Sequence, residues 1–279
     1  MRDQKGQWPL VSVVVPSYNQ AHYLGIALNS VMFQDYPNIE IIICNHGSTD
    51  GTTKVIKNFV KDVEKATVSF LDHYDEEFDQ SFVRKELPKY PQGRKIIVLE
   101  SKKNIGATAS YNLGFKAATG HYCTYLVGDD YFLPTAIKEM VDVLEKSGCD
   151  FVYADMFVVD ERGEILQHLQ KPDYSFKRCF ADWFHIGVCK LYKRALHLKF
   201  GYFDTSFRNA NDYDMYLKFA MNGAKFRHIK KTLYCVRKHD PDSSNEPAAW
   251  RNGGYENLLR ESVICCKRAR QFLKDSQNV

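Results

Sequence analysis

The sequence predicts an α/β fold with one mostly parallel central sheet flanked by helices. Three observations predict it: strand and helix patterns alternate over the first 150 residues, the strand segments are apolar throughout, and polar turns follow the strands. Strands buried on both faces read as continuous apolar runs, and strands joined through helices pair in parallel with right-handed crossovers. The length of 279 residues fits one large domain or two small ones.

Four apolar runs predict the strands of the first half, at residues 11–15, 39–44, 96–99 and 122–127. The segments between them have helical spacing over 19–33, over 104–118 and, with Pro134 in the first turn, up to residue 146. Asp50 is a favourable N-cap for a further helix that runs to about residue 60.

Residues 61–93 break this alternation. The stretch 72–79 is acidic and aromatic, and Pro88 and Pro91 follow it. We expect a surface insertion here, formed by a solvated helix and loop or, alternatively, by a flap that binds a partner.

The second half has a mixed pattern. We expect a strand at 151–154, a hairpin over 158–166, a helix at 212–221, short strands at 226–229 and 233–236, and an amphipathic helix at 256–273. This organisation predicts one domain over residues 1–245 and a C-terminal helical extension over 246–279.

The C-terminal helix combines apolar side chains with a set of basic ones: Arg260, Lys267, Arg268, Arg270 and Lys274. Such a helix suits peripheral contact with an anionic membrane surface. The more common alternative is a helix packed on its own domain or on the partner of a homodimer.

Composition excludes several classes of protein. The chain is 44% hydrophobic and 26% charged, as in soluble globular proteins, and its formal charge of +4 is too small to predict nucleic-acid binding. No run of about 18 apolar residues predicts a membrane span, and residues 1–6 are polar, unlike a signal sequence. The eight cysteines include no Cys-x-x-Cys pair, so we expect reduced thiols and a cytoplasmic protein.

Polar turns follow three of the predicted strands, at residues 16–19, 45–50 and 128–131. Ligands of open α/β sheets bind at the carboxyl ends of the strands, so these turns are the candidate binding site. The P-loop motif and the Gly-x-Gly-x-x-Gly turn are absent, which argues against a P-loop NTPase and an NAD dehydrogenase. The carboxylates of Asp129 and Asp130 suit Mg²⁺ or Mn²⁺, which a bound diphosphate would also need.

With these turns in place, the chain resembles family 2 glycosyltransferases. The resemblance runs in order over roughly residues 9–245, and its motifs are Val13 to Asn19 with Gln34, Glu40 to Ile43 with Gly47 to Asp50, Asn104-x-Gly106, Asn112-x-Gly114, Ala118-x-Gly120, Leu126 to Pro134, Gly201-x-Phe203-Asp204, Asn211-Asp212-x-Asp214 and Arg237-x-His239 with Ser243 and Ser244.

This resemblance implies the GT-A fold, a nucleotide-sugar donor, most of all a UDP-sugar, a divalent cation, and transfer with inversion. It implies an acceptor hydroxyl on a glycan or lipid-linked molecule, as in bacterial surface polysaccharide synthesis. Donor-binding residues would be Pro16, Ser17, Tyr18, Asn19, Asn45, His46, Asn104, Asn112, Asp129 and Arg237. Metal ligands would be Asp129, Asp130 and His239.

The same resemblance implies that Asp212 is the general base, with an N-cap of its helix as the structural alternative. Asp214 is two residues further along the helix and therefore points in another direction. Trp183, Asn211 and Asp214 would lie on the acceptor side. Trp183 suits stacking on a sugar ring, although a half-buried core position is an equal alternative.

The chain departs from the family pattern at a few positions. Asn45 and His46 replace two Asp residues, Val127 replaces the first Asp of an Asp-x-Asp, Tyr111 replaces an Arg, and Asn211 replaces a Glu. These changes leave the base of the donor open. They also motivate a second hypothesis, in which the chain is a non-catalytic nucleotide- or glycan-binding module that retains the GT-A fold.

Overall fold

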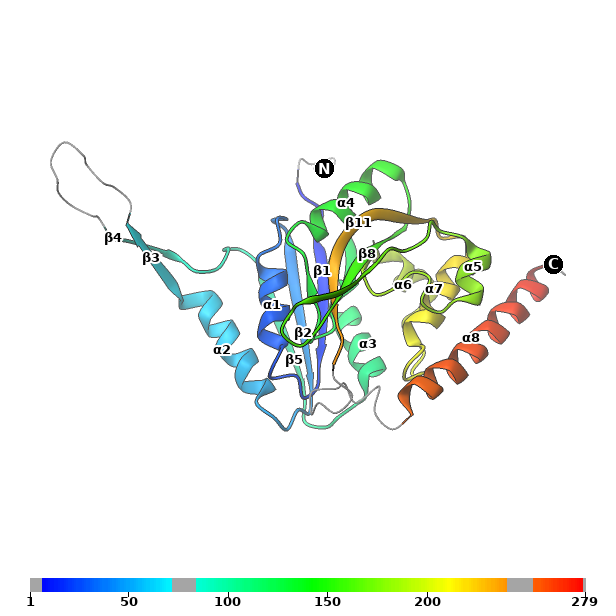
Figure 1. Cartoon of the computed structure of the whole chain (residues 1–279), viewed down its shortest axis with the longest axis horizontal. Coiled ribbons are helices and arrows are strands. Elements are labelled where there is room, and N and C mark those ends of the chain that lie inside the picture. The colour runs from blue at the N-terminus through cyan, green and yellow to red at the C-terminus, as the bar shows by residue number, and fades with distance from the viewer. Residues whose placement is uncertain (1–6, 72–83, 240–252, 278–279) are drawn as a thin grey trace.

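The computed structural model describes residues 7–71, 84–239 and 253–277. A central sheet is flanked by helices, a hairpin projects at one end, and the C-terminal helix runs along the opposite side (Figure 1). The strand order of the sheet is β5-β2-β1-β6-β10-β8-β11-β7, and β9 pairs with β8. The expected α/β fold class is therefore confirmed.

One half of the sheet is parallel, as predicted. It contains β1 (Val11–Ser17), β2 (Ile39–His46), β5 (Lys95–Ser101) and β6 (Tyr122–Tyr125). The carboxyl ends of β1 and β2 lie side by side, with Ser17 paired to Asn45. This register places the first two polar turns next to each other.

The other half of the sheet is mixed. Its strands are β7 (Tyr131–Phe132), β8 (Phe151–Val159), β9 (Ile165–Leu169), β10 (Lys190–Lys193) and β11 (Phe226–Arg237). The predicted hairpin is confirmed by the antiparallel pairing of β8 and β9. The prediction of two short strands at 226–229 and 233–236 is wrong: they are one strand, β11, because two register shifts around Thr232 let its pairing with β8 continue.

Helices cover both faces of the sheet. One core cluster joins the sheet to α1 (Leu24–Met32), α2 (Thr52–Lys65) and α4 (Ala136–Ser147). The other joins it to α3 (Ala107–Ala117), α5 (Phe176–Ala181), α6 (Ala195–Phe200), α7 (Asn211–Met221) and α8 (Gly254–Gln277). Neighbouring side chains of a strand alternate between the two clusters, as Val13 and Val14 of β1 do.

Several predicted helix ends need correction. The first helix begins at Leu24 and not at residue 19, because the preceding residues form a loop that is bonded to the turn after β2. Asp50 is not the N-cap of α2, since Gly51 holds that position, but its carboxylate accepts the N–H of Thr52 at 2.9 Å.

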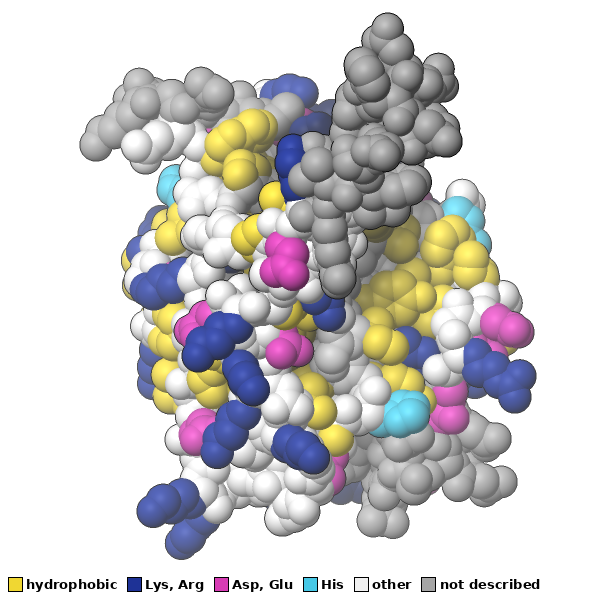
Figure 2. Space-filling view, turned by 90° about the vertical axis from the view of Figure 1, so that its left-hand side faces the viewer, with side chains coloured by type: hydrophobic (Ala, Val, Ile, Leu, Met, Phe, Trp, Pro, Cys, Tyr) yellow, Lys and Arg dark blue, Asp and Glu magenta, His cyan; other side chains and the backbone are white. Residues whose placement is uncertain are grey.

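The insertion between α2 and β5 is a hairpin and not the expected solvated helix and loop. After α2, strands β3 (Thr67–Leu71) and β4 (Arg84–Pro88) pair antiparallel and extend away from the sheet (Figure 1). Figure 2 looks onto this end of the molecule and shows exposed Lys and Arg side chains alongside acidic ones. The acidic stretch 72–79 and the expected domain boundary at 245 lie outside the described residues.

Glu40 joins three segments at the amino ends of the parallel strands, the edge of the sheet opposite the polar turns. Its side chain is fully buried and accepts hydrogen bonds from the Ser12 hydroxyl at 2.5 Å and from the N–H and hydroxyl of Thr119 at 2.6 and 2.8 Å. Burial alone would raise the pKa of Glu40, but these hydrogen bonds outweigh it and hold the pKa below its usual value.

Replacing Glu40 with Gln should lower the free energy of unfolding by about 1–3 kcal/mol at neutral pH, because donors that face the carboxylate lose a charged acceptor. Since the folded-state pKa of Glu40 is lowered, its stabilisation is present above the unfolded value of about 4.3 and disappears as the pH falls through the folded value. Denaturant unfolding at several pH values checks this. The exposed Glu100→Gln on β5 is the matched control; equal losses in both variants would contradict the prediction.

Candidate active site

The turns after β1, β2 and β5 hold one another in place. The Asn19 side-chain oxygen accepts the N–H of Thr49 at 2.8 Å, and the N–H of Asn19 donates to the Ser48 hydroxyl at 3.1 Å. Gly47 has a φ of 77°, and a Cβ there would lie 2.6 Å from the backbone nitrogen of Asn104. Only glycine allows this close approach, so the three turns form one fixed platform.

Tyr18 and His46 form the aromatic part of this platform. Their rings stack with centroids 5.3 Å apart. The oxygen of the Asn104 side chain accepts the N–H of Gly106 at 2.8 Å and lies 3.1 Å from His46 Nδ1. Nδ1 therefore carries the proton, and burial lowers the pKa of His46, so that its Nε2 is a neutral acceptor near pH 7.

Several buried polar atoms along this edge have no hydrogen-bond partner within the described residues. They include Ser17 Oγ and Asn45 Oδ1 on neighbouring strands, together with Asp129 Oδ1 and His239 Nδ1. The amide nitrogen of Asn45 is used, since it donates to the Thr53 hydroxyl at 2.9 Å. Buried polar atoms are almost always paired in folded proteins, so this group of open atoms points to a polar ligand.

The turn after β6 carries the two adjacent aspartates in different environments. Asp130 accepts the backbone N–H of Arg237 at 2.8 Å and the hydroxyl of Tyr234 at 3.0 Å, so both its oxygens are used. Burial, and then the neighbouring Asp129, raises the pKa of Asp130. Asp129 lies 2.7 Å from His239 Nε2 through one oxygen and keeps the other open.

The side chain of Arg237 fixes the turn that contains Asp129 and Asp130. Its guanidinium donates to the backbone oxygens of Asp129, Asp160 and Glu161, and it lies 4.4 Å from the ring centroid of Tyr23. Arg237, which is expected to bind the donor, therefore also fixes the acidic turn.

The expected metal ligands Asp129, Asp130 and His239 do not form a complete metal site by themselves. They fit a cation that is also bound by the phosphates of a substrate. Among residues 7–71, 84–239 and 253–277, no group of three or more His, Cys, Asp or Glu side chains could hold a metal ion. The open oxygen of Asp129 beside His239 is nevertheless a suitable partial donor set. Mg²⁺ is commonly held by one or two carboxylates plus the phosphates of a substrate.

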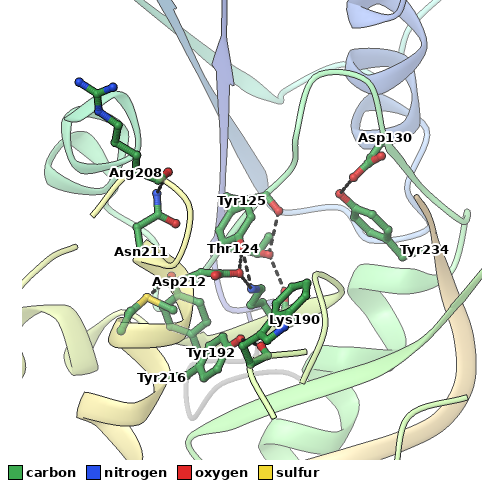
Figure 3. A network of polar contacts seen from close by, with 12 residues as sticks. Thr124, Tyr125, Asp130, Lys190, Tyr192, Arg208, Asn211, Asp212, Tyr216 and Tyr234 are labelled. Carbon is green, nitrogen blue, oxygen red and sulfur yellow. Dashed lines mark hydrogen bonds and ion pairs between the residues drawn. The ribbon is translucent and has the colours of Figure 1, made fainter. Parts of the chain in front are cut away.

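Asp212 lies beside Tyr125 of β6 and apart from Asp130, in a cluster that the sequence did not reveal (Figure 3). Its Oδ2 accepts the hydroxyl of Tyr125 at 2.9 Å and the ammonium of Lys190 at 3.1 Å. The side chain of Lys190 is fully buried, and its ammonium also donates to the Tyr125 hydroxyl at 2.6 Å. One oxygen of Asp212 is thus fixed while the side chain remains 22% exposed.

The alternative role of Asp212, as the N-cap of its helix, is wrong. The N-cap of α7 is Ala210, and the Asp212 side chain points away from the helix start toward β6 and β10. As expected, Asp214 faces elsewhere, where burial raises its pKa and Lys218 partly opposes the shift.

The start of α7 is held by the C-terminal helix. The Glu261 carboxylate of α8 accepts the backbone N–H groups of Arg208, Asn209 and Ala210 at 2.8–3.1 Å. Acceptors at a helix start satisfy N–H groups that the helix itself leaves open. The C-terminal extension therefore supports the position of Asp212.

The sequence profile of Glycosyl transferase family 2 matches residues 12–73 and 80–201, more than half of the chain. The chain belongs to this family. The expected resemblance is confirmed, and the protein is a family 2 glycosyltransferase.

Similar proteins agree with this assignment. An uncharacterized glycosyltransferase of Rickettsia typhi is 28% identical over 286 residues, which is 96% of this chain and 78% of that protein. The chondroitin synthase of Escherichia coli is 27% identical over 91% of this chain but only 33% of its own length. A crystal structure of Staphylococcus aureus TarS, residues 1–349 in complex with UDP-GlcNAc, has a TM-score of 0.65 at 19% identity, covering 95% of this chain and 70% of that one. This likeness confirms the GT-A fold.

The remaining family positions have mainly packing contacts in this glycosyltransferase. The Asn112 side chain pairs with the backbone N–H and carbonyl of Phe203, and Asn211 donates to the Thr108 hydroxyl at 2.8 Å. Val127 and half-buried Trp183 pack against the second core cluster, and Tyr111 packs edge-on against Tyr125. All eight cysteines are free, as expected. None of the described helices is long and apolar enough to cross a membrane.

Proposed function

We propose that this glycosyltransferase moves a sugar, with inversion, from a nucleoside-diphosphate donor to a hydroxyl of a glycan or lipid-linked acceptor in surface polysaccharide synthesis. One observation carries the proposal: the Asp212 carboxylate is fixed through Oδ2 by Tyr125 and Lys190 and is still partly exposed. A fixed, accessible carboxylate is what a general base requires.

Inversion requires that the acceptor hydroxyl attack the face of the sugar opposite the leaving diphosphate. Asp212 contacts Tyr125 at the end of β6, and Figure 3 shows it apart from Asp130 of the acidic turn, so the proposed base and the proposed diphosphate site are separate. Asp212 would take the hydroxyl proton as the new bond forms. Lys190 and Tyr125 are positioning residues, because they orient the carboxylate and compensate its charge.

The donor is proposed to be a UDP-sugar. The TarS structures contain UDP and UDP-GlcNAc, while a mannosyltransferase of Pyrobaculum calidifontis, with a TM-score of 0.57, contains GDP-Man and Mn²⁺. Asn45 Oδ1 and His46 Nε2 supply neutral acceptors for the N–H groups of a base. A neutral acceptor contributes less than the carboxylate it replaces, about 1 against 1.5–3 kcal/mol.

A divalent cation would be held by Asp129 and His239 together with the donor diphosphate. When bound, it would neutralise charge that develops on the leaving group. Asp130 would act indirectly, since its carboxyl ties the turn to Tyr234 and Arg237.

Calorimetric titration with UDP, GDP, CDP and dTDP tests the donor site. We expect UDP to bind with Mn²⁺ and to bind about tenfold or more weakly with EDTA. Asp129→Asn should remove this metal dependence, because it removes an open ligand. Asp130→Asn is the matched control and should largely retain it, because the Asp130 oxygens already have protein donors. If no nucleotide binds, the non-catalytic glycan-binding alternative replaces the proposal.

A further inference from the structure

Two adjoining hollows of about 330 and 410 Å³ lie between α8 and the segment that contains α5 and Trp183. Both are lined by Arg270, so they form one groove, called here the α5–α8 groove. Its aromatic walls are Phe176, Phe180, Trp183 and Tyr213. The groove contains neither Asp212 nor any of the proposed donor and metal residues, although Trp183, expected on the acceptor side, is part of its wall.

The groove is also strongly basic. Lys177, Lys267, Arg270 and Lys274 line it, all four are exposed, and no acidic side chain does. Within the described part of the chain, none of the four has an ion-pair partner. Arg268 differs, because it lies on another face of α8 and pairs with Asp204 at 2.6 Å. The four cations therefore remain available to an external anion.

Apolar side chains continue along the same flank of α8. Leu259 and Val263 are one helical turn apart, line the groove, and are 42% and 53% exposed. Apolar surface surrounded by Lys and Arg is the pattern of surfaces that lie in the interface of an anionic bilayer.

We propose that the α5–α8 groove docks the protein on an anionic phospholipid membrane. The cations would contact lipid phosphates, and the aromatic and aliphatic side chains would contact the lipid chains beneath the headgroups. A second copy of this chain fits less well. A two-fold interface through this face would bring the same four cations against themselves, and the groove has no acidic side chain to compensate them.

Docking at this face would bring the acceptor side close to the membrane. Tyr213 lines the groove, and its neighbour Asp212 faces β6. Glu261 of α8 holds the start of the same helix. A lipid-linked acceptor would then be presented to α7 from the bilayer, although membrane binding itself does not depend on the proposed transfer.

Vesicle co-sedimentation of the full chain tests the inference. We expect binding to vesicles of phosphatidylcholine with phosphatidylglycerol, weak binding to phosphatidylcholine alone, and little competition by inorganic phosphate at the same phosphate concentration. Each basic residue near a membrane contributes about fivefold in affinity, the equivalent of about 1 kcal/mol. The double variant Lys267→Glu with Arg270→Glu should therefore bind at least about 25-fold more weakly.

The matched control reverses the same number of charges on α2, with Lys57→Glu and Lys61→Glu. Both lysines are exposed, and α2 lies at the opposite end of the molecule (Figure 1). Equal loss of binding in the two double variants would overturn the proposal, because net charge and not the groove would then decide. It would also be overturned by equal binding to neutral vesicles, or by a dimer in light scattering that the groove variant abolishes.

Discussion

Replacing Asp212 with Asn should lower the rate of sugar transfer by roughly 10²–10⁴-fold and leave nucleotide binding unchanged. The amide has the size of the carboxylate and can still accept from Tyr125 and Lys190, but it cannot take the proton of an acceptor hydroxyl. The measurements are kcat and the Kd of the nucleotide. The donor in the kcat assay is a sugar linked to the nucleotide that calorimetry shows to bind.

Asp214→Asn is the control for this experiment. It makes the same chemical change in the same helix, but the Asp214 side chain faces Lys218 and not β6. Although Asp214 is expected on the acceptor side, it shares neither the Tyr125 nor the Lys190 contact of Asp212, so we expect a much smaller loss of transfer from this variant. If the Asp212 variant transferred sugar at the normal rate, Asp212 would not be the base, and equal losses in both variants would indicate damage to α7 instead.

Replacing Lys190 with Met should lower kcat by between about tenfold and a hundredfold with little change in the KM for the donor. The variant removes a charged hydrogen bond worth about 1.5–3 kcal/mol that holds the Asp212 carboxylate, and Met occupies a similar volume. Lys193→Met is the matched control, since Lys193 is on the same strand but pairs with Asp150 at 2.9 Å. An unchanged kcat would contradict a positioning role.

The pH profile gives a second readout for Lys190. Burial lowers the pKa of its ammonium below the usual 10.5, although Asp212 opposes the shift. The wild-type rate should therefore fall on the alkaline side at a pH below 10.5, as the ammonium loses its proton. Lys190→Arg should keep its charge there, since an arginine side chain does not lose its proton in proteins. An identical alkaline limb in the Arg variant would exclude Lys190 as its source.

The parallel half of the sheet could be predicted from the sequence because its signals are local. Apolar runs such as 11–15 and 39–44 need both faces covered whatever the rest of the chain does, and the turns that follow them are polar. The family motifs predicted the GT-A fold, and the apolar pattern of residues 212–221 predicted a helix that begins close to Asp212, where α7 begins. Neither conclusion requires contacts between distant residues.

Other features depend on segments that are far apart in the chain. Periodicity around Thr232 predicts a break, and only pairing with β8 shows that β11 is continuous. The acidic stretch 72–79 obscured the strand pattern of the segments on either side of it. These segments form the hairpin of β3 and β4, in which Val68 pairs with Leu87. In both cases strand pairing, which is not local, overrides the local pattern.

The sequence by itself determined the fold class, the family and the residues at the carboxyl ends of the strands. The tertiary structure alone decided what each polar group contacts. From the sequence, Lys190 looks like an ordinary surface lysine. In the structure β10 lies between β6 and β8, so Lys190 is buried and its ammonium contacts Asp212. Likewise, only the packing of β11 shows that both carboxylate oxygens of Asp130 accept hydrogen bonds from Tyr234 and Arg237. The physical reason is that burial and charge pairing belong to contacts across the chain, which a local pattern of residues does not contain.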